Sequence, residues 1–125
     1  MSGAGEVVSA VIPTRNRPAF VGRAVRSALN QTLQSVEVIV VVDGPDERTV
    51  YALAQISDSH LRIISLKESV GAQEALNVGV RESHGLLVAF LGDDDEWLPT
   101  KVERQLRVAQ TSRWSHPHVS GGLIA

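Results

Sequence analysis

The sequence predicts an α/β fold, in which helices cover both faces of a mainly parallel β-sheet and so form a three-layer sandwich. Three observations lead to this prediction. Short runs of valine, isoleucine and leucine alternate along the 125-residue chain with segments of helical periodicity. The runs hardly alternate between apolar and polar residues, which is typical of strands buried on both faces. Regular alternation of strand and helix produces parallel strands joined by right-handed crossovers.

Four apolar runs are the predicted strands, at residues 7–12, 36–42, 61–66 and 86–91. The second run, VEVIVVVDG, is the most convincing of them. A further stretch, HVSGGLIA, has the composition of a fifth strand that is just beginning. We therefore expect one domain over residues 1–125 that is truncated after its fourth or fifth strand, as a fragment of a larger protein would be.

The segments between the runs carry apolar residues at helical spacing. The first helix is expected to include Pro18 in its first turn, where the missing N–H group costs nothing. Weaker periodicity over residues 50–56 predicts a second helix, and an apolar stripe over residues 72–80 predicts a third. A fourth begins at Thr100, because Thr100 and Glu103 have the spacing of a capping box.

The composition narrows the classes of function. The chain is 43% hydrophobic and 21% charged, has a formal net charge of −2, and contains no cysteine. Disulfides, thiolate metal sites and cysteine nucleophiles are therefore excluded, and nothing indicates a nucleic-acid partner. No apolar stretch approaches the roughly 20 residues of a membrane span, and the start does not resemble a signal peptide. We expect a cytoplasmic protein, or one that is peripheral at the inner face of the membrane.

Polar side chains follow each predicted strand. The four segments read PTRNRP from residue 13, DGPDE from residue 43, KESVGA from residue 67 and GDDDE from residue 92. The carboxyl ends of parallel strands meet at one edge of a sheet, where ligands bind near the point at which the strand order reverses. The sequence therefore predicts a ligand site at this edge.

The triple aspartate Asp93–Asp94–Asp95 has two interpretations. Adjacent carboxylates repel one another, and a bound Mg²⁺ or Mn²⁺ that also holds a substrate's phosphates relieves the repulsion. The alternative is a solvated turn whose aspartates cap the segment that follows. Asp43 likewise has two interpretations, a role in ligand binding or a purely structural role, because Asp-Gly-Pro-Asp is a good turn sequence. Arg15 and Arg17 face either an anion or water.

The histidines and tryptophans give weaker indications. His116 and His118 flank Pro117 and could chelate a metal, although two imidazoles without a third ligand are more typical of an exposed loop. Trp97 and Trp114 are expected to pack against the core or the sheet edge. The chain lacks the GxGxxG and GxxxxGK[ST] motifs of common dinucleotide and P-loop sites.

Taken together, four segments resemble successive blocks of family 2 glycosyltransferases, an inverting group with the Rossmann-like GT-A fold. The segments read VSAVIPTRNRP, ALNQTLQSVEVIVVVDGPDE, SVGAQEALNVG and VAFLGDDDEWLPTKVERQ. They occur in the family's order over residues 8–105. The resemblance implies that the chain binds a UDP-, GDP- or dTDP-linked sugar for transfer of a hexosyl or related group to a saccharide or other hydroxyl acceptor.

The resemblance also implies roles for individual residues. The segment Pro13, Thr14, Arg15 and Asn16 and the residue Asp43 would hold the nucleoside, with Asp43 pairing with the base. In the DxD motif, Asp93 would contact the ribose and Asp94 would bind Mg²⁺ or Mn²⁺ on the donor diphosphate. Asp95 also lies on the motif and would assist at the metal.

The chain departs from the family pattern at four positions. Val42 replaces the first of two aspartates, Arg15 a frequent aromatic residue, Leu76 a common arginine, and Gly92 a frequently acidic residue. In the family the general base lies well downstream of the metal motif, so we expect it outside this chain and expect negligible transfer from the chain alone. No catalytic residue is therefore assigned.

Two other classes of function remain as alternatives. A non-catalytic nucleotide-binding or assembly module would explain Leu76 and the absent base. A receiver-type signalling domain shares the length and the αβ alternation, but it needs an acidic pair after the first strand, where this chain has PTRNRP. A homo-oligomer is conceivable because an unpaired strand edge is a template for further pairing.

Overall fold

The computed structural model describes residues 8–112, 119–120 and 123–124 of the chain. The helices are α1 (Pro18–Leu29), α2 (Glu47–Ala54), α3 (Ala72–Arg81) and α4 (Lys101–Ser112). The strands are β1 (Val8–Thr14), β2 (Val36–Val42), β3 (Leu61–Ser65), β4 (Leu87–Phe90), β5 (Val119–Ser120) and β6 (Leu123–Ile124). The four predicted strands and four predicted helices are thus present in the predicted order.

Four of the strands form a parallel sheet with β1 at its centre. The order across the sheet is β3-β2-β1-β4-β6-β5. Val8 to Thr14 of β1 lie opposite Val36 to Val42 of β2, and the start of β1 also pairs with β4. The predicted fifth strand is wrong in form, because β5 and β6 are two-residue strands that pair antiparallel with each other, and β6 pairs antiparallel with β4.

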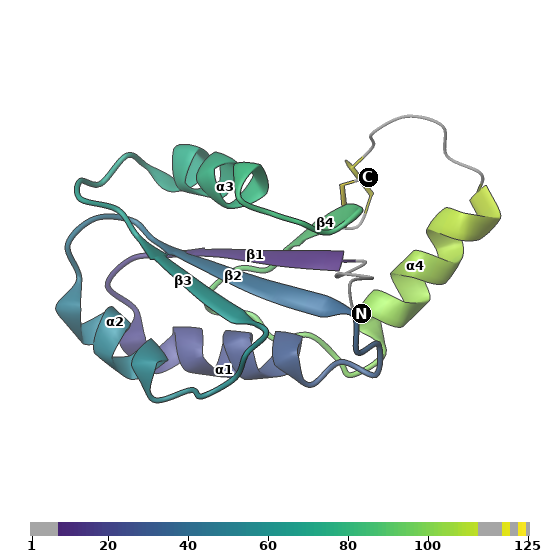
Figure 1. The fold of residues 1–125 in the computed structure, drawn as a ribbon, viewed down its shortest axis with the longest axis horizontal. Helices are drawn as coiled ribbons and strands as arrows, with labels where there is room; N and C mark the ends of the chain where they lie inside the picture. Colours follow the sequence, from purple (N-terminus) through teal and green to yellow (C-terminus); the bar gives the residue numbers. More distant parts are fainter. Residues whose placement is uncertain (1–7, 113–118, 121–122, 125) are drawn as a thin grey trace.

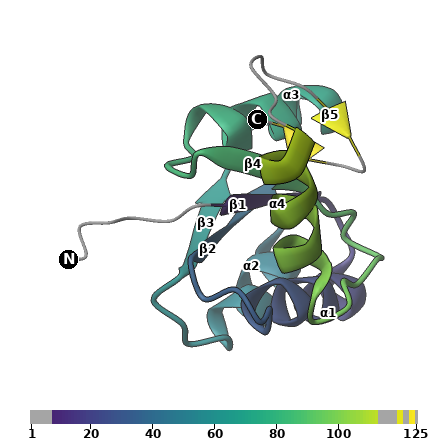
Figure 2. The ribbon, with the colours of Figure 1, turned by 90° about the vertical axis from the view of Figure 1, so that its right-hand side faces the viewer.

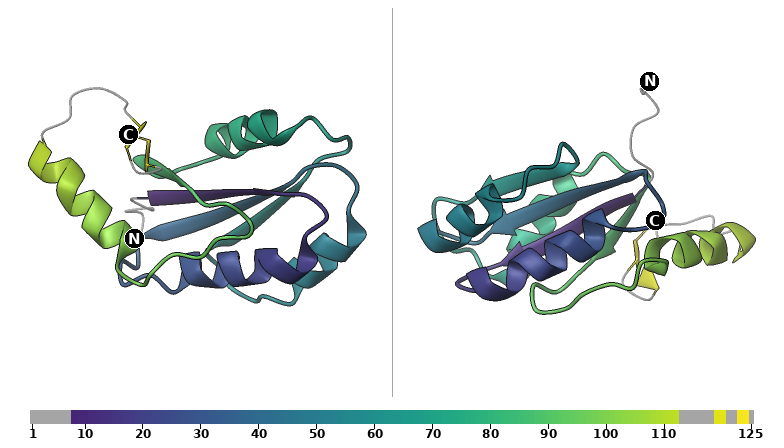
Figure 3. Two further views of the ribbon diagram at one scale, coloured as in Figure 1. Left: turned by 180° about the vertical axis from the view of Figure 1, so that it is seen from behind. Right: turned by 90° about the horizontal axis from the view of Figure 1, so that it is seen from below.

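Helices cover the sheet on both faces (Figures 1 and 2). Below the sheet in Figure 1 lie α1 and α2, which contact each other, while α3 lies above it and α4 stands at one end. The view from below in Figure 3 shows α1 running lengthwise along the strands. The main core lies on the α1 side and includes Ile12, Val25 and Leu53, whereas a smaller cluster of Ile39, Val41 and Ala75 lies under α3. This arrangement is the predicted three-layer sandwich.

Close packing of α3 on the sheet depends on Gly79. A Cβ atom at this position would collide with the side chain of Val11 on β1, and it would come within 3.2 Å of Val41 on β2. Protein cores tolerate such overpacking poorly. The small residue therefore lets α3 approach the strands that carry the candidate site.

The ends of the strands differ from prediction in two respects. Pro13 and Thr14 belong to β1 rather than to the loop after it, because β2 continues to Val42 and pairs with both residues. Proline is tolerated there since β4 pairs with β1 only as far as Val11, so the missing N–H faces no partner strand. β3 is not covered on both faces, because it lies at the sheet edge and Ile63 is 37% exposed.

Other expectations have mixed outcomes. The fourth helix begins at Lys101, one residue after Thr100, and the Glu103 carboxylate accepts hydrogen bonds from the Thr32 hydroxyl and from Arg107. Trp97 packs against the main core, as predicted. Trp114, His116 and His118 lie outside the described residues. Among the described helices, none is long and apolar enough to cross a membrane.

Candidate functional site

The candidate site lies at the carboxyl ends of β1, β2 and β4, where Thr14 connects the neighbouring chain segments. The backbone N–H of Asp43, directly after β2, donates to the Thr14 carbonyl at 2.9 Å. The Thr14 hydroxyl donates to Asp93 Oδ2, after β4, at 2.7 Å. Thr14 is only 4% exposed, so both contacts are well shielded from water. The structure therefore brings Asp43 and Asp93 to the same edge of the sheet.

Arg17 bridges two carboxylates of the acidic segment. Its Nη1 atom lies 3.4 Å from Asp93 Oδ1 and 3.3 Å from Asp94 Oδ2. The Asp93 side chain is 13% exposed, whereas those of Arg17 and Asp94 are half-exposed. Arg17 is a site residue that the sequence did not single out, because the resemblance places the nucleoside-holding segment at residues 13–16 and Arg17 follows it.

A tight turn gathers the carboxylates of Asp94 and Asp95. The N–H of Asp95 donates to the Gly92 carbonyl at 3.0 Å, which closes the turn. A Cβ atom at Gly92 would lie 3.0 Å from Asp95 Oδ2 and 3.3 Å from Asp94 Oδ1. The two oxygens therefore converge over the bare face of Gly92, which a side chain would fill.

The oxygen ligands of this turn suit a hard divalent cation such as Mg²⁺ or Mn²⁺. Among the residues that the structure describes, no group of three or more histidine or acidic side chains is placed to hold a metal ion. Mg²⁺ commonly takes only one or two carboxylates and completes its shell with water and substrate phosphates. The residues present thus fit a cation that is shared with a substrate and not one that the chain encloses alone.

The segment after the acidic turn is held by hydrogen bonds to α1 and to the loop that follows α1. The Ser27 hydroxyl accepts from the N–H of Trp97 at 3.0 Å. Gln31, which is 2% exposed, donates to the Leu98 carbonyl at 2.8 Å and accepts from the N–H of Val102 at 2.9 Å. Gln31 was not singled out from the sequence, but it fixes the position from which the acidic turn projects.

Asp43 anchors the loop that precedes α3. Its carboxylate accepts from the N–H groups of Val70 at 2.7 Å and Gly71 at 3.1 Å, and from the Ser69 hydroxyl at 3.1 Å. Asp43 is 5% exposed. Its predicted contact with a nucleoside base stays a prediction, and the structure adds this loop-holding role.

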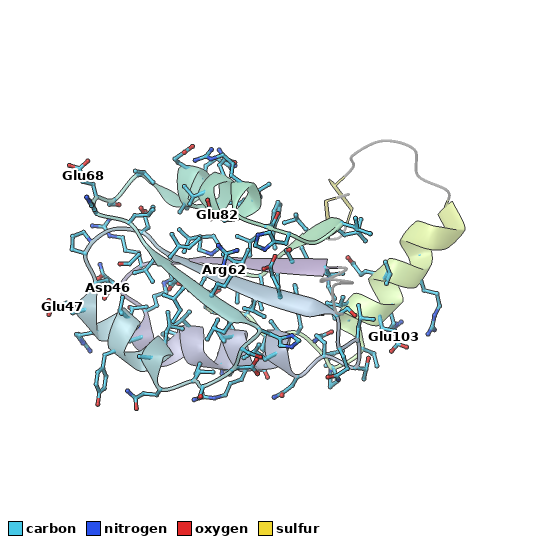
Figure 4. All side chains as sticks on the ribbon, viewed as in Figure 1. Asp46, Glu47, Arg62, Glu68, Glu82 and Glu103 are labelled. Carbon is cyan, nitrogen blue, oxygen red and sulfur yellow. The ribbon has the colours of Figure 1, made fainter. Side chains whose placement is uncertain are left out.

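Asp46 ties the first loop to α2. Its carboxylate caps α2 by accepting from the N–H and hydroxyl of Thr49, and it also accepts from the N–H of Asn16 at 2.6 Å. Burial tends to raise the pKa of Asp46, but these hydrogen bonds outweigh it and hold the pKa below its ordinary value. In Figure 4, Asp46, Glu47 and Glu68 lie at the same end of the molecule, far from Glu103.

The first loop itself contains two of the predicted nucleoside-binding residues. Asn16 has a φ of 56°, and the Arg15 side chain is exposed.

A family model described as glycosyl transferase family 2 matches residues 9–114. The Escherichia coli UDP-Glc:alpha-D-GlcNAc-diphosphoundecaprenol beta-1,3-glucosyltransferase WfaP is 32% identical over 86% of this chain and 43% of its own length. An uncharacterised glycosyltransferase of Haemophilus influenzae is 36% identical over 83% of this chain and 35% of its own length. The chain thus spans less than half of the length of these curated relatives.

Two solved structures are similar in fold. S. aureus TarS 1–349 in complex with UDP-GlcNAc has a TM-score of 0.78 at 19% identity, covering 92% of this chain and 35% of that one. The mannosyltransferase PcManGT from Pyrobaculum calidifontis, in complex with GDP-Man and Mn²⁺, has a TM-score of 0.76 at 22% identity, covering 93% and 35%. At such low identity the likeness concerns the fold, and it confirms the predicted GT-A architecture.

Proposed function

The chain belongs to glycosyl transferase family 2, and we propose that it is the donor-binding part of an inverting glycosyltransferase. In this proposal it binds a nucleotide-diphosphate sugar together with Mg²⁺ or Mn²⁺. The observation that supports it most is the pair of hydrogen bonds at Thr14, which link Asp43 and Asp93 to one residue at 2.9 and 2.7 Å. The carboxylates of Asp43 and Asp93, which are proposed to contact the base and the ribose, would then lie beside the same bound nucleotide.

The proposed roles follow the order of the strands. Pro13 to Asn16 and Asp43 hold the nucleoside, and Asp93 contacts the ribose. Asp94 binds the cation with help from Asp95. A bound cation supplies the positive charge that stabilises the departing nucleoside diphosphate.

UDP is the first nucleotide to test, and GDP and dTDP follow. WfaP is named for UDP-Glc, and TarS was solved with UDP-GlcNAc, whereas PcManGT was solved with GDP-Man. The acceptor in this proposal presents a saccharide hydroxyl, for which WfaP gives a model in its lipid-diphosphate-linked GlcNAc. Family membership leaves the receiver-domain alternative without support.

The general base that takes the proton from the acceptor hydroxyl is expected in the part of the relatives that this chain does not match. We therefore propose that the 125 residues alone transfer sugar far more slowly than full-length relatives. A radiolabelled donor assay tests this expectation. Transfer at rates comparable to those of full-length relatives would refute it.

Calorimetry with UDP, with and without Mn²⁺, tests the metal site. We expect Mn²⁺ to strengthen UDP binding to the wild-type chain and Asp94→Ala to abolish this metal dependence, because the variant loses the carboxylate proposed to hold the cation. Asp43→Ala should weaken UDP binding about tenfold even without metal, since a hydrogen bond to a charged group contributes about 1.5–3 kcal/mol.

Glu96→Gln is the matched control for these variants. Glu96 is the next acidic residue along the turn, and its exposed side chain pairs with Arg23 at 3.5 Å. This variant should keep both the affinity and the metal dependence of the wild type. Because Asp43 also anchors a loop, thermal unfolding of Asp43→Ala is measured in parallel. Equal metal dependence in Asp94→Ala and wild type would contradict the metal assignment.

A further inference from the structure

Arg17 occupies a position that is suited to a cation. A single nitrogen, Nη1, contacts Asp93 Oδ1 at 3.4 Å and Asp94 Oδ2 at 3.3 Å, so one positive charge is shared between the two carboxylates and offsets part of their negative charge. We propose that Arg17 is an internal counter-ion of this pair, that a divalent cation must displace it, and that this exchange couples metal binding to nucleotide binding. The inference rests on the proposed function, because it assumes that Asp94 of this pair receives the cation.

The backbone that carries Arg17 is held firmly in place. The preceding residue, Asn16, has a φ of 56°, a left-handed conformation that only a few residue types adopt readily. Its N–H donates to the Asp46 carboxylate at 2.6 Å. The Arg17 carbonyl accepts from the N–H groups of Phe20 and Val21, both at 3.1 Å, in the first turn of α1. The loop therefore presents Arg17 to the acidic turn reproducibly.

The side chain of Arg17, in contrast, is free to leave. It is 50% exposed, and both ion pairs are long for charge-assisted contacts. An exposed ion pair of this kind changes an equilibrium by a factor of only about 1.5–5. A divalent cation carries twice the charge on a smaller ion, so it competes effectively for the same oxygens.

Displacement of Arg17 creates the coupling. A released guanidinium beside a divalent cation is repelled by it, which weakens the binding of the metal alone. A nucleoside diphosphate brings several negative charges to the same place and removes this repulsion. Metal and nucleotide should therefore strengthen each other's binding, and the effect must be reciprocal.

Titration of the purified chain with Mn²⁺, followed by the electron paramagnetic resonance of the free ion, tests this inference. Without nucleotide, Arg17→Met should bind Mn²⁺ about threefold to tenfold more tightly than wild type, because the ion pairs of Arg17 with Asp93 and Asp94 no longer compete. The factor by which UDP improves Mn²⁺ affinity should fall correspondingly. Arg17→Lys keeps the charge, and a single nitrogen of Arg17 makes both contacts, so no bidentate geometry is lost and the variant should stay within about twofold of wild type in both quantities.

Arg23→Met is the matched control. Arg23 lies on α1, six residues after Arg17. It is similarly exposed at 56%, and it pairs with Glu96 and not with Asp93 or Asp94. The substitution Arg23→Met removes one positive charge from the chain, as Arg17→Met does, so any general effect of net charge appears in both variants. We expect Arg23→Met to change Mn²⁺ affinity by less than about twofold.

Each remaining outcome decides the question. Mn²⁺ affinity without UDP that is equal in Arg17→Met and wild type, or weaker in Arg17→Met, would overturn the counter-ion role alone and leave the proposed function standing. Failure of every variant to bind Mn²⁺, with or without UDP, would overturn the proposed function and this inference together.

Discussion

Thr14 gives the candidate site much of its geometry. Its carbonyl accepts a hydrogen bond from Asp43, which follows β2, and its hydroxyl donates one to Asp93, which follows β4. Thr14 itself ends β1, which lies between β2 and β4. The hydroxyl matters because Asp93 Oδ2 is largely shielded and needs a donor. The position of Asp93 thus depends in part on the neutral hydroxyl of Thr14.

Thr14→Val tests this dependence by replacing the hydroxyl with a methyl group of similar shape. We expect UDP binding in the presence of Mn²⁺ to weaken about threefold to tenfold, since the loss of such a hydrogen bond costs about 1 kcal/mol. Calorimetry measures the change. Thr14→Ser keeps the hydroxyl and should bind within about twofold of wild type, and equal binding by the Val and Ser variants would show that the hydroxyl has no positioning role.

The acidic residues could be predicted from the sequence, whereas the role of Arg17 could not. Three adjacent aspartates after an apolar run are visible in the sequence alone. The contact between Arg17 and Asp93 spans 76 positions of the chain. Whether Arg15 or Arg17 makes it depends on the left-handed turn at Asn16, which no periodicity encodes.

At the scale of elements, the interiors of strands and helices were predictable and their ends were not. β2 is buried along its whole length, and its unbroken apolar run shows this directly. β1 extends through Pro13 because β2 is long enough to pair with it there. β4 pairs with β1 only as far as Val11, so it contains no acceptor that would require an N–H group at Pro13. The stretch HVSGGLIA misled the prediction because its apolar residues suit either one strand or two short ones.

β2 also contains a buried charge that its apolar pattern conceals. Glu37, 3% exposed, accepts from the Ser9 hydroxyl and the His84 N–H, both at 2.7 Å, and lies 3.7 Å from Arg62. Burial raises the pKa of Glu37, but the hydrogen bonds from Ser9 and His84 outweigh it and hold the pKa below its ordinary value. This cluster fastens the amino ends of β1 and β2, at the opposite end of the strands from the candidate site.

Glu37→Gln should reveal this contribution through its dependence on pH. The pKa of Glu37 is lower in the folded state than its unfolded value of 4.5, so its charge stabilises the fold fully at pH values above 4.5. This stabilisation is lost as the pH falls through the pKa of the folded state. We expect a loss of about 1–3 kcal/mol in the free energy of unfolding at neutral pH. The difference from wild type should shrink towards about pH 3.

Urea denaturation at both pH values measures this difference, with Glu82→Gln as the control. Glu82 pairs with the same Arg62, but its side chain is 52% exposed. The control should lose no more than about 0.5 kcal/mol at either pH. A difference for Glu37→Gln that is as large at low pH as at neutral pH would contradict the stabilising role of the charge.

At the scale of the whole molecule, the strand order places the site. The chain proceeds from β1 outward to β2 and β3, and then returns to add β4 on the other side of β1. Ligands of such sheets bind where the order reverses, and Thr14, Arg17 and Asp93 lie at this point. The alternating pattern predicted a parallel sheet, but it could not give the strand order, because the apolar runs are too alike to show which strand lies at the centre.

We propose above all that one nucleotide lies across the carboxyl ends of β2, β1 and β4 and shares a cation with the acidic turn. A crystal structure of the chain with UDP and Mn²⁺, with the metal located by its anomalous scattering, is the decisive measurement. We expect Mn²⁺ bound to Asp94 and the diphosphate, with the uracil beside Asp43. Mn²⁺ away from residues 93–95, or UDP bound elsewhere on the molecule, would contradict it.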